Sequence, residues 1–326
     1  MLRPDREFWV NAALVAGLVM APAIAALMNE VYFINLSSRV VIIAMAAVGL
    51  NLALGYGGMI SFGHAAFFGL GGYVAGISAH HAFEESHFLD LIPGSDQMLL
   101  IWLAAIIVAG FLALFIGAIS LRTKGVYFIM ITLAFAQMIY YLAISIPTYG
   151  GEDGLSIYVR NNLFGLDTDN PLIFFSICFL WLMISLYFSH RIMGARFGAA
   201  LTMAKLNDMR LATSGIEPFP VRLTAFVLSA MIASGAGALF ADLNGFVGPS
   251  MLSWHRSGEI MVIVILGGVG RLFGPIAGAI VFVLLETFIG GITERWQFFL
   301  GLILLIVVLF ANGGLMGIAT GKARHD

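Results

Sequence analysis

The sequence predicts an all-α protein that crosses a membrane many times, and three observations lead to this fold class. Hydrophobic residues make up 60% of the 326 residues and charged residues only 10%, whereas an average soluble domain is about 45–50% apolar and about 25% charged. The apolar residues form successive runs, many of them close to the ~20 residues that span a bilayer as a helix. Short polar segments with turn-forming residues separate these runs.

About ten of these runs are expected to form transmembrane helices, within a single transmembrane domain of residues 1–326. The first begins near Phe8. Because its length approaches a bilayer span, we interpret it as a helix and not as a cleaved signal peptide. The third follows a glycine-rich turn and ends before residue 80. The nine spans other than the third are predicted at 8–28, 39–54, 98–120, 126–146, 171–189, 223–243, 257–268, 273–288 and 296–311.

Lys and Arg side chains are divided unequally between the connecting segments. When the spans are threaded with the N-terminus inside, twelve of the sixteen fall on the inner side and four fall outside. The positive-inside rule therefore predicts that both chain ends are cytoplasmic. The acidic segments 80–97 and 147–170 are then exterior. The twelve are Arg3, Arg6, Arg122, Lys124, Arg191, Arg196, Lys205, Arg210, Arg222, Arg271, Lys322 and Arg324, and the four are Arg39, Arg160, Arg256 and Arg295.

Several classes of chemistry have no basis in the sequence. The single cysteine, Cys178, excludes intrachain disulfides. Gly321-Lys322 is the nearest approach to a phosphate-binding loop, but it lacks the glycine five residues earlier. No paired carboxylates of the kind used by proton-coupled carriers occur at the centre of a predicted span. We therefore expect a transport subunit, not an enzyme, that binds no cofactor or metal itself and has no nucleic-acid partner.

The segment from Asn51 to Gly76 combines eight glycines with mostly apolar residues. Small residues allow helices to pack closely in a membrane, and irregular backbone is tolerated there only where protein buries it or where it lines a watery cavity. We interpret this segment as a wall of a translocation pathway, and we expect leucine at Gly63 or Gly72 to damage its packing. Its polar residues are Asn51, Tyr56, Ser61, His64 and Tyr73. His64 could contact a solute in transit, although bridging two helices is the simpler role.

Residues 190–222 form the longest inner segment with substantial positive charge. The pattern predicts a helix from Ala195 to about Leu211, with a stop at Gly215 and Ile216 and prolines beyond it. A short helix across the inner face could receive motion from a cytoplasmic ATPase. The alternative is an ordinary basic loop that only fixes the orientation of the chain.

The stretch GYGGMISFGHAAFFGLGGYVAG resembles the signature of permease subunits of branched-chain amino acid ABC transporters, of the LivM type. The resemblance continues through Gly125-Val-Tyr-Phe, the Gly-Gly-Glu-Asp-Gly turn at 150–154, the 190–222 segment and Leu266-Gly-Gly-Val-Gly. It implies the ten-helix fold of type II ABC importers and an ATPase-docking loop, whose residues here are Lys205, Asn207, Asp208, Arg210, Gly215 and Ile216. The family's usual Arg-Glu-Asn-Glu core is Lys205-Leu-Asn-Asp208 in this chain.

The same resemblance implies partners and a location. These are a homologous LivH-type permease subunit, two cytoplasmic ATPases that carry ATP and Mg²⁺, and an extracytoplasmic solute-binding protein, assembled in the lipid of the inner membrane. The charged residues near the predicted outer rim could receive the binding protein or could be ordinary interfacial charges. They are Arg39, Asp242, Arg256, Glu259 and Glu286. Related permeases for urea and short amides or for aromatic acids remain alternatives, and a secondary carrier or a passive channel is a more distant one.

Overall fold

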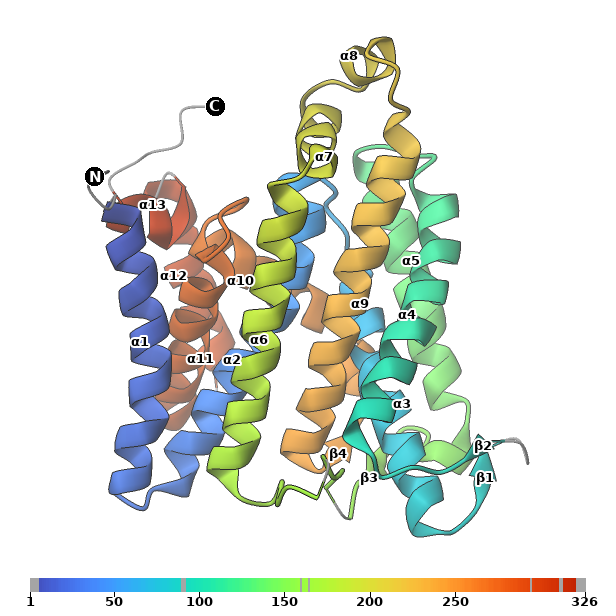
Figure 1. Ribbon diagram of the computed structural model, residues 1–326, viewed down its shortest axis with the longest axis vertical. Coiled ribbons are helices and arrows are strands. Elements are labelled where there is room, and N and C mark those ends of the chain that lie inside the picture. Colours follow the sequence, from blue (N-terminus) through green and yellow to red (C-terminus); the bar gives the residue numbers. More distant parts are fainter. Residues whose placement is uncertain are drawn as a thin grey trace.

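A computed structural model of the chain describes residues 6–88, 92–158, 160–163, 165–293, 295–310 and 313–320. Arg3, Ala311, Gly321, Lys322 and Arg324, which the sequence analysis names, lie outside these residues. The described chain is a bundle of long helices (Figure 1). The helices are α1 (Arg6–Leu27), α2 (Val31–Asn51), α3 (His64–Phe83), α4 (Met98–Ser120), α5 (Val126–Ile144), α6 (Pro171–Met193), α7 (Arg196–Leu206), α8 (Asp208–Thr213), α9 (Pro218–Asn244), α10 (Trp254–Gly267), α11 (Gly274–Ile292), α12 (Trp296–Phe310) and α13 (Gly314–Thr320).

The two ends of the bundle carry different structures. The start of α1, the short helices α7 and α8, and α13 lie at one end, which we call the docking end. Four two-residue strands lie at the other, forming the antiparallel pairs β1 (His87–Phe88) with β2 (Ile92–Pro93) and β3 (Leu155–Ser156) with β4 (Phe246–Val247). The 190–222 segment, predicted to be inner, and the 80–97 and 147–170 segments, predicted to be outer, therefore lie at opposite ends of the molecule.

Each predicted apolar run coincides with a helix, and the expectation of a mainly helical membrane protein is confirmed. Among the described residues, seven helices are long and apolar enough to cross a membrane by length and composition: α1, α2, α4, α5, α6, α9 and α11. Of the remaining predicted spans, α3 has 20 residues, α12 has 15 and α10 has 14. At 1.5 Å per residue, α10 covers only about 21 Å of a hydrocarbon core of about 30 Å.

The predicted start of the second helix at Arg39 is wrong, because α2 begins at Val31. Two serines made the segment before Arg39 look like a polar break. Their hydroxyls instead donate to carbonyls four residues earlier, Ser37 to Phe33 at 2.8 Å and Ser38 to Ile34 at 3.1 Å. A serine that satisfies its hydroxyl in this way is tolerated inside a helix.

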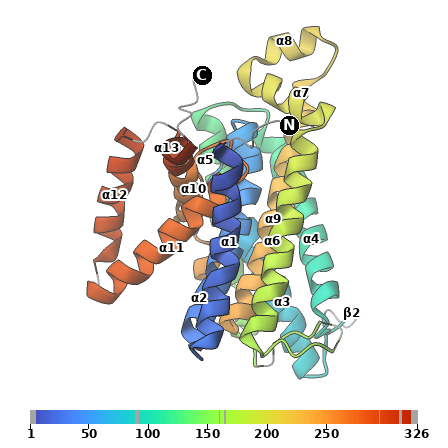
Figure 2. The ribbon, with the colours of Figure 1, turned by 60° about the vertical axis from the view of Figure 1, so that its left-hand side comes forward.

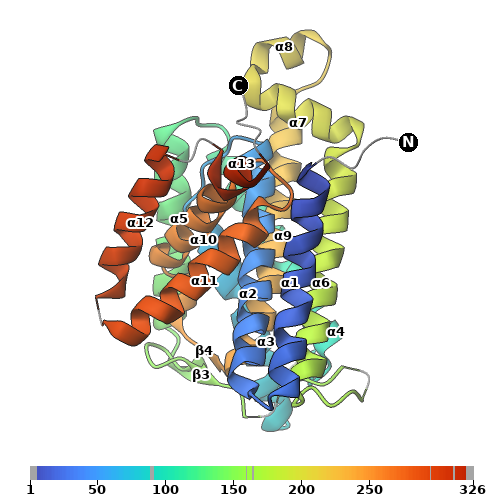
Figure 3. The same cartoon turned by 90° about the vertical axis from the view of Figure 1, so that its left-hand side faces the viewer.

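Helices α2 and α9 form the centre of the bundle. They pack against each other, and one or both contact α3, α4, α6, α10 and α11. In the most apolar part of each helix, 72% of the residues are buried in the helix that runs from α2 into η1 and 67% in α9. The corresponding share is 17% in both α1 and α5. Figure 3 shows α1, α2 and α6 side by side, and Figure 2 shows α11 and α12 diverging from the rest. The outer helices thus present their apolar faces to lipid.

Two stretches of irregular backbone enter this bundle. The first, residues 57–63, joins the π-helix η1 (Leu52–Tyr56) at the end of α2 to the start of α3. The second, residues 245–253, leads through β4 and the short helix η3 (Pro249–Leu252) to α10. The Ser257 hydroxyl of α10 holds the end of the first stretch, because it accepts from the Ala65 amide at 2.8 Å and donates to the Phe62 carbonyl at 2.7 Å. Non-helical backbone at this depth is tolerated because protein surrounds it.

Close approach of α3 and α9 explains part of the glycine content. A Cβ on Gly71 would collide with the carbonyl oxygen of Ser234, and one on Gly237 would collide with that of Phe68. At Gly72, by contrast, the nearest atom is the terminal methyl of Met251, 2.7 Å from the ideal Cβ position. The flexible end of a methionine can move, whereas a helix backbone cannot.

These contacts predict a graded response to alanine. Gly71→Ala is expected to destabilise the protein by about 3 kcal/mol or more, because overpacking against backbone displaces a helix. Gly72→Ala is expected to cost at most about 1 kcal/mol. Gly110→Ala is the control, since its Cβ would sit 3.5 Å from the Met231 side chain, and alanine in a helix is favoured by about 1 kcal/mol. Thermal unfolding and yield in detergent measure the order, and equal midpoints for the variants at 71 and 72 would contradict it.

Candidate functional site

The most prominent surface feature is the projection formed by α7 and α8 at the docking end (Figure 1). The prediction of one helix over 195–211 is wrong, because the helix is interrupted at Asn207. This residue is extended, with φ −161° and ψ 111°, and its side-chain oxygen accepts from the amides of Met209 at 2.9 Å and Arg210 at 3.3 Å. Asn is a preferred N-cap because it satisfies amides that the helix leaves without partners. Asn207 thus ends α7 and starts α8.

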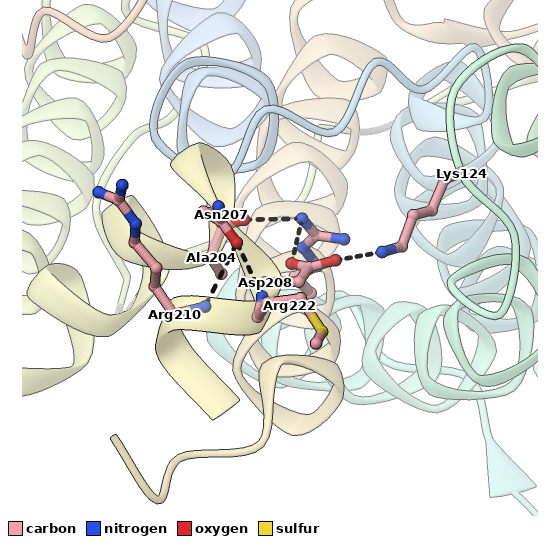
Figure 4. A network of polar contacts seen from close by, with 7 residues as sticks. Lys124, Ala204, Asn207, Asp208, Arg210 and Arg222 are labelled. Atoms are coloured by element: carbon pink, nitrogen blue, oxygen red, sulfur yellow. Dashed lines mark hydrogen bonds and ion pairs between the residues drawn. The ribbon is translucent and has the colours of Figure 1, made fainter. Parts of the chain in front are cut away.

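Asp208 braces α8 against the rest of the molecule, as Figure 4 shows. Its carboxylate forms ion pairs with Arg222 at the start of α9, at 2.8 Å, and with Lys124 in the turn between α4 and α5. Arg222 also donates to the Ala204 carbonyl of α7 at 2.8 Å. The Asp208 side chain is only 21% exposed. It is therefore placed to orient α8, and its carboxylate is engaged within the chain.

The end of α8 has the geometry predicted for Gly215. That residue has φ +85°, in the left-handed region that glycine adopts without steric cost. The Gly215 amide donates to Ala212 at 3.0 Å and the Ile216 amide donates to Leu211 at 3.3 Å. This pair of bonds is the Schellman motif, which satisfies the last carbonyls of a helix. The chain then turns sharply back to α9.

The tip of the projection is apolar. Leu206 is 80% exposed and Met209 is 74% exposed on either side of Asn207, and Arg210 and Ile216 are also exposed. We define Leu206, Met209 and Arg210 as the docking tip. Leu206 and Met209 were not among the predicted site residues. The sequence alone did not distinguish them, because the same segment holds many other apolar residues, such as Phe197, Leu201 and Leu211.

Lys205 points away from the tip. Its Nζ donates to the carbonyl of Gly55 in η1 at 3.2 Å, across 150 residues of sequence. The residues predicted to form one docking surface are therefore divided. Arg210 and Ile216 face solvent, Asn207 and Gly215 shape the helix ends, and Asp208 and Lys205 bind other parts of the chain.

The structure places the predicted pathway residues in the interior, around the first irregular stretch. Asn51 is 2% exposed and holds the turn before α11, because it accepts from the Gly270 amide and donates to the Arg271 carbonyl, both at 2.9 Å. Ser61 is fully buried and accepts from the Gly63 amide at 3.1 Å.

His64 lies at the start of α3 and joins three helices. Its Nε2 is 2.7 Å from the Ser229 hydroxyl of α9, and that hydroxyl donates to the Gly49 carbonyl of α2 at 2.5 Å. Because serine has a single hydroxyl proton, Nε2 of His64 is the donor. The ring is fully buried between Phe67 and Phe226, with ring centroids 5.9 and 5.6 Å away. This geometry fits the helix-bridging role.

The two tyrosines of the same group lie apart from one another. Tyr56 is half-buried at the end of η1, where it packs against the cluster that contains Leu201 and Phe226. Tyr73 is 7% exposed in the middle of α3. The five predicted pathway residues therefore follow the course of the chain from α2 into α3, and the structure does not gather them around a single cavity.

The charged residues predicted for the outer rim form two ion pairs and one buried group. Arg39 pairs with Glu286 of α11 at 2.7 Å, and Arg256 pairs with Glu259 within the first turns of α10 at 2.7 Å. Asp242 is 1% exposed and accepts from the Asn161 amide group at 2.5 Å. Arg160 covers it, donating to the backbone carbonyls of Asp242 and Thr168. These contacts attach the 147–170 segment to the end of α9.

In the part of the chain that the structure describes, no group of three or more His, Cys, Asp or Glu side chains could hold a metal ion. Cys178 is buried. The projecting pair α7–α8 remains a candidate surface for a partner, because Leu206 and Met209 are exposed on it.

Sequence comparison finds relatives among membrane transport permeases. The sequence profile described as the permease component of the branched-chain amino acid transport system matches residues 32–309. The high-affinity branched-chain amino acid transport system permease protein LivM of Escherichia coli K12 is 26% identical over 327 residues, covering 93% of this chain and 74% of the relative. The protein of the same name from Salmonella typhimurium LT2 is 25% identical over 309 residues, covering 87% and 69%. No solved structure matches the chain.

The family profile covers far more than half of the chain and includes η1, both irregular stretches and the α7–α8 projection. Together with the multiple apolar helices, it identifies a multi-pass membrane protein whose relatives are transport components and not enzymes. The chain belongs to the family of branched-chain amino acid ABC transporter permeases, and within it resembles the LivM type.

Proposed function

We propose that this chain forms one half of a translocation pathway in the inner membrane, driven by ATP hydrolysis in partner subunits. Its partners would be a LivH-type permease, two cytoplasmic ATPases that hold ATP and Mg²⁺, and an extracytoplasmic binding protein. The solute would be a branched-chain amino acid, as the names of the relatives suggest. The observation that carries the proposal is the α7–α8 projection at the docking end. Ion pairs of Asp208 hold it against the rest of the chain, and Leu206 and Met209 are exposed at its tip.

Two properties of the projection favour docking over an ordinary basic loop. Leucine and methionine side chains exposed beyond the membrane-spanning helices gain about 1.5–3 kcal/mol each when a partner buries them. Apolar anchors inserted into a partner's pocket, with polar residues around them, are the usual source of affinity at an interface. In addition, Asp208 and its two basic partners fix α8 against α9 and the α4–α5 turn. A loop retained only for its charge would require neither feature.

The distribution of charge supports a cytoplasmic docking end. Basic residues in the segments at this end outnumber those at the opposite end, where Arg160 is partly exposed and Arg295 is exposed. The segments at the strand-bearing end carry Glu84, Glu85, Glu152 and Asp153. The excess of Lys and Arg at the docking end is the positive-inside pattern.

Substitutions at the docking tip test the ATPase contact. Leu206→Glu and Met209→Glu are each expected to weaken ATPase binding by about 2 kcal/mol, roughly thirtyfold, because a charge would enter an apolar pocket. Leu206→Met and Met209→Leu are the matched controls, with binding within about threefold of the wild type. Affinity of the purified permease pair for the ATPase subunits, in lipid nanodiscs, is the measurement. If both glutamate variants bind normally, the tip is not the interface.

Asp208 should contribute to ATPase binding by orienting α8, and Arg210 should contribute by contacting the ATPase directly. Asp208→Ala removes a half-buried carboxylate and leaves Arg222 without it, so we expect a loss of about 1–3 kcal/mol in ATPase affinity. Arg210→Ala removes an exposed charge and is expected to cost about 0–1 kcal/mol. The double variant Asp208→Ala, Arg222→Met should lose less than the sum of its two single variants, since these residues interact. Additive effects in that cycle would show that the ion pair does not position α8.

Thiol labelling tests the orientation in the membrane. In a Cys178→Ala background, single cysteines replacing the exposed residues Glu84 and Asp169 should react with an impermeant maleimide added to intact cells. A cysteine replacing Thr213, which is exposed on α8, should react only after the membrane is opened. The charge asymmetry between the two ends is the reason for this expectation. Labelling of the cysteine at 213 in intact cells would reverse the assigned topology.

A further inference from the structure

Helix α10 begins near the middle of the bundle and not at either end. Ser257, in its first turn, binds the Ala65 amide at the start of α3. From Ser257 to Gly267, beside the turn that η1 contacts at the docking end, α10 rises about 15 Å. From Ala65 to Gly76, which packs against Val247 of β4, α3 rises about 16 Å toward the strand-bearing end. The first turns of α10 therefore lie about halfway across a hydrocarbon core of about 30 Å.

An ion pair occupies these first turns of α10. Nη1 of Arg256 lies 2.7 Å from Oε2 of Glu259, and the two side chains are 21% and 30% exposed. The guanidinium also lies over the ring of Phe240, 5.3 Å from its centroid. Among the residues that the structure describes, Oε1 of Glu259 and the other guanidinium nitrogens have no hydrogen-bond partner. Both charged groups therefore keep hydrogen-bonding capacity for a further ligand.

Neither lipid contact nor helix packing explains a partly exposed ion pair at this depth. Ionisable side chains within a membrane almost always face the interior of a bundle or a water-filled cavity. The pair of Arg39 with Glu286 has a structural role, because it joins α2 to α11. Arg256 and Glu259 belong to one helix and join no elements, and such a pair adds little to helix stability. The surface beside them therefore contacts water in the assembled protein.

The helix α5 carries a further polar side chain at this level of the membrane. Helices α5 and α12 both contact α10, and all three lie on the same side of the bundle (Figure 3). Gln137 lies about 16 Å along α5 from its start at the docking end, and its side chain is partly exposed. It makes no side-chain hydrogen bond to the described part of the chain. Two neighbouring helices thus carry polar side chains near the membrane centre.

We propose that Arg256 and Glu259 bind the solute as it passes the membrane centre, and that they fit a zwitterionic α-amino acid. The Arg256 guanidinium binds the solute carboxylate, and the Glu259 carboxylate binds the solute ammonium group, through charge-assisted hydrogen bonds. A zwitterion leaves no charge without a partner. An anionic acid would place two carboxylates against one guanidinium, and a neutral amide would use neither charge. The inference rests on the proposed function in placing the translocation pathway along this face of α10.

Three variants of the complete transporter, reconstituted in liposomes with its binding protein, test this inference. The double variant Arg256→Gln, Glu259→Gln removes both charges together, so that neither is left unpaired. Arg256→Lys keeps the positive charge. The double variant His80→Gln, Glu84→Gln is the matched control, because it removes a contact of 3.3 Å between two residues of one helix at the strand-bearing end. Uptake of tritiated leucine, ATP hydrolysis stimulated by the binding protein, retention of the ATPase subunits and the thermal midpoint are measured together.

We expect the variant neutral at 256 and 259 to keep its ATPase subunits and its stimulated hydrolysis within about twofold, while leucine uptake falls about tenfold or more. Arg256→Lys should recover at least about a third of the uptake, and the control should match the wild type. A pair with a purely structural role would tolerate joint neutralisation. Uptake within about threefold of the wild type in the neutral variant would therefore overturn the inference. Loss of the ATPase subunits from that variant would also overturn it, because the pair would then serve assembly. Failure of the wild-type chain itself to bind an ATPase would instead refute the proposed function.

Discussion

The fold depends on hydrogen bonds made by irregular backbone inside the bundle. An amide or carbonyl left without a partner in an apolar interior costs several kcal/mol. Ser257 meets this requirement at the start of α3 with one hydroxyl that both accepts and donates. His64 and Ser229 link the same region to the backbone of α2. With these bonds in place, α3 and α10 can each begin within the molecule and run to opposite ends.

The same constraint connects the interior to the surface of the docking end. The Gly55 carbonyl lies in the last turn of the π-helix η1, and it accepts from Lys205 of α7. Further along the projection, Asp208 fixes α8 to Arg222 and Lys124. The projection is therefore part of the packed structure, and only its tip is free to contact another protein.

The sequence predicted the helices well because apolar runs and their boundaries are local properties. It also located the stop at Gly215, because a left-handed residue after a helix has a local signature. The errors arose where a side chain bonds to the backbone. Ser37 and Ser38 continue a helix by bonding back to it, and Asn207 divides one by capping the next. Composition and periodicity do not distinguish these two uses of a polar side chain.

The candidate site was harder to predict, because its contacts join residues far apart in the sequence. Lys205 and Asp208 were grouped with Arg210 as charges for a partner. The structure shows Lys205 bonded to a residue 150 positions away and Asp208 paired with Lys124, 84 positions away. Charge and spacing along one loop contain no information about such pairings. The exposed side chains at 206 and 209 could not be predicted either, because Leu201 and Leu211 of the same segment are fully buried and the sequence does not distinguish the two pairs.

The interrupted segment before α3 also determines when the protein can complete its fold during synthesis. The serine that satisfies Phe62 lies 195 residues later in the chain, and the one that bonds Gly49 lies 180 residues later. Until α10 has been synthesised, the Phe62 carbonyl lacks the serine that it accepts from in the folded protein. The carbonyl of Gly49 likewise gains its bond to Ser229 only after α9 has been made. The final hydrogen bonding around the start of α3 is therefore completed only when the C-terminal half of the chain has arrived.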